Sequence, residues 1–159
     1  MVRIELKTEI AAPIERCFDL ARNIDLHIAS TDQTEEQAIA GVTTGMIGEG
    51  ETVTWRGRHF GFIVTHTSRI TAFALPRHFQ DSMVRGLFKR FHHDHYFEVQ
   101  GDGTTMADVM EFEAPCGIVG RLIERILLLK HLQLLLEKRN DCIKRVAESD
   151  EWKKYLPSV

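Results

Sequence analysis

The feature that most restricts the fold is a long helical pattern near the C-terminus, which follows a series of strand-like segments. Residues 118–148 read IVGRLIERILLLKHLQLLLEKRNDCIKRVAE, with apolar residues at helical spacing over roughly thirty positions. An average helix is far shorter, at about 11–12 residues. Pro115 and Gly117 separate this helix from the strand pattern before it. A helix with this many apolar residues must pack against an apolar surface, and an antiparallel sheet with one apolar face provides one.

The rest of the chain predicts that sheet. Residues 2–7 alternate apolar and charged side chains, as a half-buried strand does. A short helix is predicted after Pro13, and a second short helix or turn over residues 24–31. From Glu36 onward about six strands follow, separated by turns that contain glycine. The predicted fold class is α+β, with an antiparallel sheet and a long C-terminal helix in a single domain over residues 1–159.

Composition limits the classes of function. The chain has 159 residues, a formal net charge of −3 and no strong basic excess, so a nucleic-acid partner is not expected. Cys17, Cys116 and Cys142 are odd in number and widely spaced, which favours reduced thiols over disulfides or a zinc knuckle. The N-terminus lacks a signal-peptide pattern, and no run reaches the ~18 uncharged apolar residues of a membrane span. We therefore expect a cytoplasmic protein without stable membrane insertion.

The segment KRFHHDHYFEV, residues 89–99, places three histidines and an aspartate inside a strand pattern. Successive side chains of a strand point to opposite faces of the sheet, so alternation divides the segment into two sets. His92 and Asp94 belong to the set predicted to face solvent. The set predicted to face inward holds the phenylalanines and the valine, and consists of Phe91, His93, His95, Phe97 and Val99.

The next strand, residues 105–113, is expected to bring an aspartate close to these histidines. A turn at Asp102-Gly103 would fix the register of the hairpin. Asp108 would then lie beside Phe97 and diagonally near His95, within side-chain reach. The inner set of this strand is Met106, Asp108, Met110 and Phe112.

Two earlier strands are expected to complete the inner wall. The strand over residues 77–85 turns back through residues 86–89, which would place Asp81 level with His93 or His95. The inner residues that alternation assigns to these two strands are Phe79, Asp81 and Met83 in one, and Val53, Trp55 and His59 in the other. The interior should then hold acids and imidazoles together, which offsets the cost of burying each of them.

Several motifs together resemble the helix-grip superfamily, also called SRPBCC or START-like. It includes START lipid-transfer domains, the major birch pollen allergen and polyketide cyclase/dehydrases; the bacterial ligand-binding branch often named cyclase/dehydrase-like is the most similar. The motifs extend over nearly the whole chain and are Phe79-x-Asp81, Gly86-x-Phe88, Phe91-x-His93-x-His95-x-Phe97, Met106-x-Asp108 and Pro115-x-Gly117. Leu87 departs from that branch, which often has proline there. The resemblance implies a seven-stranded antiparallel sheet that grips the C-terminal helix around a hydrophobic cavity, but a fold does not fix a function.

Three interpretations of the inward cluster are open. His93 and His95 with Asp81 or Asp108 could chelate zinc or iron, although cysteine ligands and a standard zinc spacing are missing. A carboxylate could instead orient His95 as a general base for enolisation, aldol cyclisation or dehydration. The third interpretation is a satisfied polar network that fixes strand packing or orients a ligand. On balance we expect no metal and no cofactor, and the candidate catalytic residues are His93, His95, Asp108 and Asp81.

The long helix is the other open point. Its apolar residues extend around the cylinder, which indicates burial on two sides, a surface for a dimer or another protein, or transient membrane contact. Leu136 and three further residues of this helix are expected to line the cavity.

The function expected from the sequence is binding of a small hydrophobic molecule, such as a lipid, a polyketide or an aromatic metabolite, between sheet and helix. The alternatives are a polyketide cyclase/dehydrase-type enzyme and a partner-binding module that uses the long helix, and a homodimer is left open. The residues expected to contact the ligand are Trp55, His59, Phe79, Asp81, Met83, Phe91, His93, His95, Phe97, Met106, Asp108, Met110, Phe112, Leu122, Ile126 and Leu129.

Overall fold

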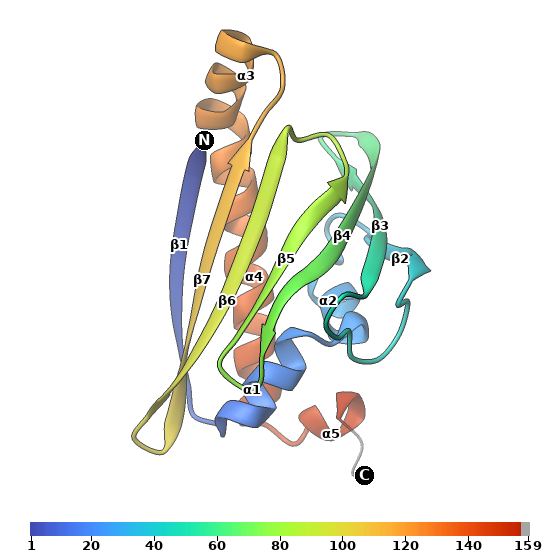
Figure 1. Cartoon of the computed structure of the whole chain (residues 1–159). Coiled ribbons are helices and arrows are strands. Elements are labelled where there is room, and N and C mark those ends of the chain that lie inside the picture. Colours follow the sequence, from blue (N-terminus) through green and yellow to red (C-terminus); the bar gives the residue numbers. More distant parts are fainter. Residues whose placement is uncertain (157–159) are drawn as a thin grey trace.

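A curled antiparallel sheet wraps around one long helix, with short helices at either end (Figure 1). The computed structural model describes residues 1–156, except for the side chain of Glu124. In chain order the elements are β1 (Val2–Ile10), α1 (Ile14–Ala21), α2 (Ile24–Ser30), β2 (Gln37–Gly41), β3 (Thr52–His59), β4 (Phe62–Ala74), β5 (His78–Arg85), β6 (Arg90–Gln100), β7 (Gly103–Glu113), α3 (Gly117–Ile123), the π-helical turn η1 (Glu124–Leu128), α4 (Leu129–Glu148) and α5 (Trp152–Tyr155).

The sheet has seven strands in the order β1-β7-β6-β5-β4-β3-β2, and every neighbouring pair is antiparallel. After β1 the chain passes through α1 and α2 to the opposite edge, and a meander from β2 to β7 then returns it to β1. The predicted fold class is thereby confirmed, including the two short helices after the first strand. The concave face of the sheet holds α4 (Figure 1).

The two short helices begin where local chemistry favours a helix start. Pro13 precedes α1 with a φ of −60°, which suits the first turn of a helix. Asn23 caps α2, because its side-chain oxygen accepts a hydrogen bond of 2.9 Å from the backbone N–H of Leu26. Both helices bury their apolar faces and close one end of the space between sheet and α4 (Figure 1).

The long C-terminal helix differs from the sequence prediction in its first third. It is interrupted by η1, and a π-helical turn inserts an extra residue and so rotates the residues before it relative to those after it. The segment before α4 also extends past the end of the sheet (Figure 1), so it has no strand to cover. Of the three alternatives for this helix, burial on two sides does not apply to this part, whose exposed apolar residues are Ile118, Val119, Leu122, Ile123, Ile126 and Leu127.

Two apolar clusters fill the space between sheet and helices. The first is centred on Phe18 of α1, whose ring meets those of Phe73, Phe79 and Phe97 edge-on at 5.3–5.5 Å between centroids. We call it the Phe18 cluster; it also includes Met106, Ile143 and other buried residues of the same end. The second, the Phe112 cluster, has as its buried members Ile4, Met110, Phe112 and Leu136.

The hairpin between β6 and β7 differs from the prediction by one residue. Gln100 pairs with Gly103, so the turn consists of Gly101 and Asp102 rather than the Asp102-Gly103 pair. Gly101 takes a φ of +58° at the first central position, where glycine is favoured in a type II′ turn. The shift places Asp108 directly opposite His95 instead of beside Phe97.

Helix α5 packs back onto the domain. Trp152 and Tyr155 of α5 contact the Phe18 cluster, and the guanidinium of Arg16 lies 4.3 Å from the centre of a Trp152 ring. Within residues 1–156, no helix combines the length and the apolar character that crossing a bilayer demands.

Candidate functional site

A cavity of about 650 Å³ lies between the sheet and the C-terminal helix. Its walls come from the inward faces of β3 to β7, from α2 and α4, and from the segment between β7 and α4. Most of the lining is apolar, including Ile70, Phe79 and Leu132. Six of the eight histidines of the chain also line it. Five of them belong to two polar clusters, and the sixth, His66, is linked to the first cluster through Ser68.

Asp108 is the centre of the first polar cluster. Its side chain is fully buried, and its Oδ1 accepts hydrogen bonds from His93 Nε2 and His95 Nδ1, both at 2.9 Å. Asn140 Nδ2 donates to Oδ2 at 2.6 Å, and Arg139 Nη1 lies 3.5 Å from Oδ1. Burial alone would raise the pKa of Asp108, but the two histidine hydrogen bonds outweigh it and hold the pKa well below its usual value. Asp108 is therefore a buried carboxylate with four donors around it.

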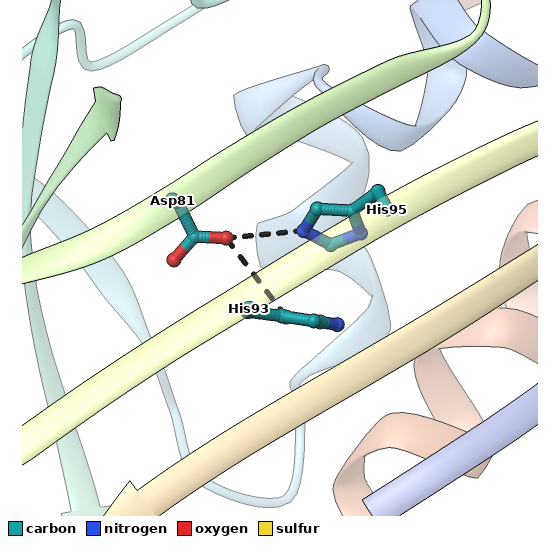
Figure 2. Close-up of side chains that lie close together, drawn as sticks. All are labelled: Asp81, His93 and His95. Atoms are coloured by element: carbon teal, nitrogen blue, oxygen red, sulfur yellow. Dashed lines mark hydrogen bonds and ion pairs between the residues drawn. The ribbon is translucent and has the colours of Figure 1, made fainter. Parts of the chain in front are cut away.

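Asp81 faces the same two histidines from the cavity side. Figure 2 shows its carboxylate to one side of the two rings and directed at both: Oδ2 lies 3.0 Å from His95 Nε2 and 3.9 Å from His93 Nδ1. Ser68 Oγ donates to Oδ1 at 3.3 Å. Burial would raise the pKa of Asp81, but the hydrogen bond with His95 and the charge interactions with His93, His95 and His66 together outweigh it and lower the pKa. Burial lowers the pKa of His93, so its neutral form is favoured.

The strand register explains why these side chains meet. His93 lies opposite Asp81 on β5, and His95 lies opposite Asp108 on β7. Asp94, the acid adjacent in sequence to both histidines, points to the outer face, where His78 Nε2 lies 2.8 Å from its Oδ1. The prediction that the acids nearest the inward histidines come from other strands is confirmed.

The first polar cluster forms a layer between the two apolar clusters. On β6 it lies between Phe91 and Phe97, and on β7 Asp108 lies between Met106 and Met110. On α4, Arg139 and Asn140 occupy the same level. Sequence reasoning missed these two residues. The available signal was a polar residue at position 140 within a stripe that is apolar at Leu136, Ile143 and Ala147.

The second polar cluster surrounds Glu36. His27 Nε2 lies 2.8 Å from Glu36 Oε2, and His59 Nε2 lies 3.6 Å from Oε1. The other nitrogen of His59 is 3.0 Å from His131 Nε2, and the His27 ring stacks on Trp55 at 4.2 Å between centroids. Of these residues the sequence singled out only His59 and Trp55. The others come from α2, from α4 and from the residue before β2, so no local pattern links them.

We expect Glu36 to make folding stability depend on pH. Burial raises the pKa of Glu36, but the hydrogen bonds with His27 and His59 outweigh it and bring the pKa below its usual 4.5. The unfolded chain then binds more protons, so this contribution is complete above about pH 4.5 and is lost as the pH falls through the lower pKa. Glu36→Gln should destabilise the protein near neutral pH, and this deficit should shrink by on the order of 2 kcal/mol towards about pH 2. Urea denaturation at a series of pH values measures the loss of stability in Glu36→Gln and its change with pH. A loss that stays the same at every pH would contradict the lowered pKa of Glu36.

The structure places only half of the residues expected to contact a ligand on the cavity wall. Those on the wall are Trp55, His59, Phe79, Asp81, Phe91, His93, His95 and Met110. Phe97, Met106 and Phe112 point inward, but their side chains pack inside the two apolar clusters instead of lining the cavity. Those that lie elsewhere are Met83 and Leu129, half-buried outside the lining, Asp108, behind the histidines, and Leu122 and Ile126, exposed on the projecting segment.

Comparison with solved structures shows shared architecture at low sequence identity. TTHA0849 from Thermus thermophilus superposes with a TM-score of 0.71 at 17% identity, covering 92% of this chain and 99% of that one. The ginseng major latex-like protein 151 from Panax ginseng gives 0.67 at 13% identity, covering 93% and 98%. The di-domain ARO/CYC BexL from the BE-7585A biosynthetic pathway gives 0.73 at 13% identity, covering 93% of this chain and 50% of that one.

These superpositions establish the fold of the chain. It is the helix-grip fold that the sequence resemblance implied, with the sheet, the short helices and the C-terminal helix in matching places. No known family profile matches the sequence, and no curated protein matches it. Any conclusion about function must therefore come from this chain's own cavity and its residues.

Proposed function

We propose that the protein binds a small, largely apolar molecule that carries a hydroxyl or carbonyl group. The observation that carries the proposal is the cavity of about 650 Å³, which has apolar walls and a polar cluster on one side. Pockets for small molecules typically span ~300–1,000 Å³ and combine apolar lining with a few polar groups that set orientation. A lipid, a polyketide or an aromatic metabolite fits this description.

The two kinds of wall have different roles in this proposal. Side chains such as Ile70 and Leu132 supply affinity through buried apolar area, on the order of 25 cal/mol per Å² before the costs of binding. Asp81 and His95 are the groups that recognise the oxygen of the ligand, since both line the cavity and remain polar within an apolar surround. The resemblance to START-like proteins supports this division of roles.

Trp55 provides a direct test, because it lines the cavity and stacks on His27. The chain has two tryptophans, so Trp152→Phe leaves Trp55 as the only one. We expect an apolar probe such as 1-anilinonaphthalene-8-sulfonate to quench Trp55 fluorescence saturably, with one probe bound per chain. Native mass spectrometry of the protein purified from cells should in addition show a retained small molecule. A protein that is isolated empty and whose Trp55 does not respond to any apolar probe would contradict the proposal.

A second candidate function is supported by the position of His95 between two carboxylates at the cavity wall. Such a pair suits acid–base catalysis of the cyclase or dehydratase type. The same mass-spectrometric experiment separates the two functions: a retained molecule that stays chemically unchanged on prolonged incubation supports binding alone, and loss of water from it supports catalysis.

A further inference from the structure

We propose that Asp81, His93 and His95 bind a divalent transition-metal ion, with Zn²⁺ as the reference ion, and that its open coordination position faces the cavity. The site does not depend on the identity of any organic ligand; with the ion bound, a ligand oxygen would occupy the open coordination position instead of contacting Asp81 and His95 directly. Two imidazoles and one carboxylate form a ligand set that zinc and other divalent transition metals accept. Three protein ligands with an open position are the arrangement of reactive rather than purely structural zinc sites.

The ligand atoms already lie close to the required separations. One atom from each of the three residues can be chosen so that all lie within 4.8 Å of one another. Asp81 Oδ2 is 3.0 Å from His95 Nε2 and 3.9 Å from His93 Nδ1 (Figure 2). Tetrahedral ligands about 2.0–2.2 Å from a zinc ion are separated from one another by roughly 3.3–3.6 Å. The two distances from Asp81 Oδ2 lie within a few tenths of an ångström of that range, and small rotations of the two imidazoles would complete the set.

Counting protons shows why a cation belongs at this point. A neutral imidazole has one N–H, and each ring directs one nitrogen to Asp108: His93 uses Nε2 and His95 uses Nδ1. The remaining nitrogens, His93 Nδ1 and His95 Nε2, then present lone pairs toward an oxygen of Asp81 that also only accepts. As long as both rings are neutral, the 3.0 Å contact between His95 and Asp81 therefore has no proton to make it a hydrogen bond, and a metal ion resolves the conflict for all three groups at once.

Asp108 has the role of an outer partner in this arrangement. Histidines that bind a metal through one nitrogen usually donate the other N–H to a carboxylate or a carbonyl, which fixes the ring and its tautomer. Asp108 accepts from both rings at 2.9 Å and is itself held by Asn140. The orientation of His93 and His95 is thus already set before an ion arrives.

Charge supports the same site. Asp81 and Asp108 contribute two negative charges, and Arg139, 3.5 Å from Asp108, contributes one positive charge. With both rings neutral, one negative charge is left without compensation against an apolar cavity, which is unfavourable. A divalent ion removes this negative charge and brings the total to +1, which suits an anionic oxygen ligand at the open position. A single proton on His95 would neutralise the cluster, but it would leave His93 Nδ1 facing Asp81 at 3.9 Å without a hydrogen bond.

The cluster around Glu36 provides a matched comparison within the same cavity. There the protons suffice: His59 can donate from Nε2 to Glu36 and accept at Nδ1 from His131. His27 donates to the other oxygen of Glu36. A cluster with three histidines and one carboxylate thus needs no ion, whereas the cluster with two histidines and two carboxylates does.

The test is zinc titration of the metal-free protein by calorimetry, repeated with Co²⁺, whose visible spectrum reports nitrogen and oxygen coordination. We expect one ion per chain for the wild type and for two control variants, His59→Gln in the second cluster and His78→Gln on the outer face. Asp81→Asn and His93→Gln should each weaken zinc binding by at least about 100-fold, since each removes a direct ligand. A wild type that does not bind zinc, or undiminished binding in both ligand variants, would overturn the site.

A second measurement keeps the test valid if a ligand variant does not fold. In the wild type, zinc should shift the ring nitrogen resonances of His93 Nδ1 and His95 Nε2 in a nitrogen-15 spectrum. The resonances of His78 and His92 should stay unchanged. Zinc shifts confined to His59 and His131 would instead assign the ion to the second cluster and refute this proposal.

Discussion

Asp108→Ala is expected to lower the free energy of unfolding by about 3–5 kcal/mol, the range seen when one partner of a buried ionic network is removed. The carboxylate is fully buried and accepts hydrogen bonds from His93, His95 and Asn140. Without it these donors, together with the guanidinium of Arg139, remain buried without their acceptor, and each carries a desolvation cost. Urea or thermal denaturation followed by circular dichroism measures the loss.

Asp94→Ala is the matched control, because Asp94 is an aspartate on the neighbouring strand of the same sheet but on its outer face. It interacts with His78 and Gln80 at 2.8–3.1 Å, and its side chain keeps 17% of its exposure. Partly solvated pairs contribute about 1 kcal/mol or less. Equal losses for the two variants would show that the inner network does not hold sheet and helix together.

Val64→Trp is expected to weaken binding of 1-anilinonaphthalene-8-sulfonate by at least about 100-fold, which corresponds to about 2.7 kcal/mol. Val64 lines the cavity from β4, where it lies opposite Gly57 of β3. An indole at position 64 therefore occupies volume that a bound molecule needs. Titration followed by the fluorescence of the probe measures the affinity.

Ile63→Trp is the control for this experiment, since position 63 adjoins position 64 but its side chain is 56% exposed and points away from the cavity. The same bulky residue there should leave the affinity unchanged within about twofold, as expected of a surface substitution. If both variants bind the probe like the wild type, its site is not this cavity. The exposed apolar residues of the segment before α4 would then be the next place to examine.

Alternation in the sequence was sufficient to assign most side chains to a face of the sheet. Because a strand repeats every two residues, the phenylalanines of β6 identify the faces of His92, His93, Asp94 and His95 without any tertiary information. The assignment by alternation failed at the C-terminal end of β6. Val99 was assigned to the inner set but is 62% exposed, since it lies beside the hairpin turn, where the sheet extends past the packed core.

Assigning a residue to the inner face of a strand does not say whether its side chain reaches the cavity or packs in the core. Phe97 and Phe91 share one face of β6, yet Phe97 is buried in the Phe18 cluster while Phe91 lines the cavity. The difference depends on where α1 packs, which the pattern of β6 does not contain. Register between strands was likewise only partly accessible. The sequence placed Asp81 level with His93 or His95, and the structure pairs it with His93.

By itself the sequence determined the α+β class, the antiparallel sheet, the two short helices and the inward direction of His93, His95, Asp81 and Asp108, because these follow from local periodicity. Only the tertiary structure decided that Asp108 lies opposite His95 and that the projecting segment leaves its apolar residues exposed. It also decided that Arg139, Asn140 and the Glu36 cluster join the interior. These outcomes depend on hairpin register, on the π-helical turn and on packing between elements distant in the chain, and no local pattern encodes them.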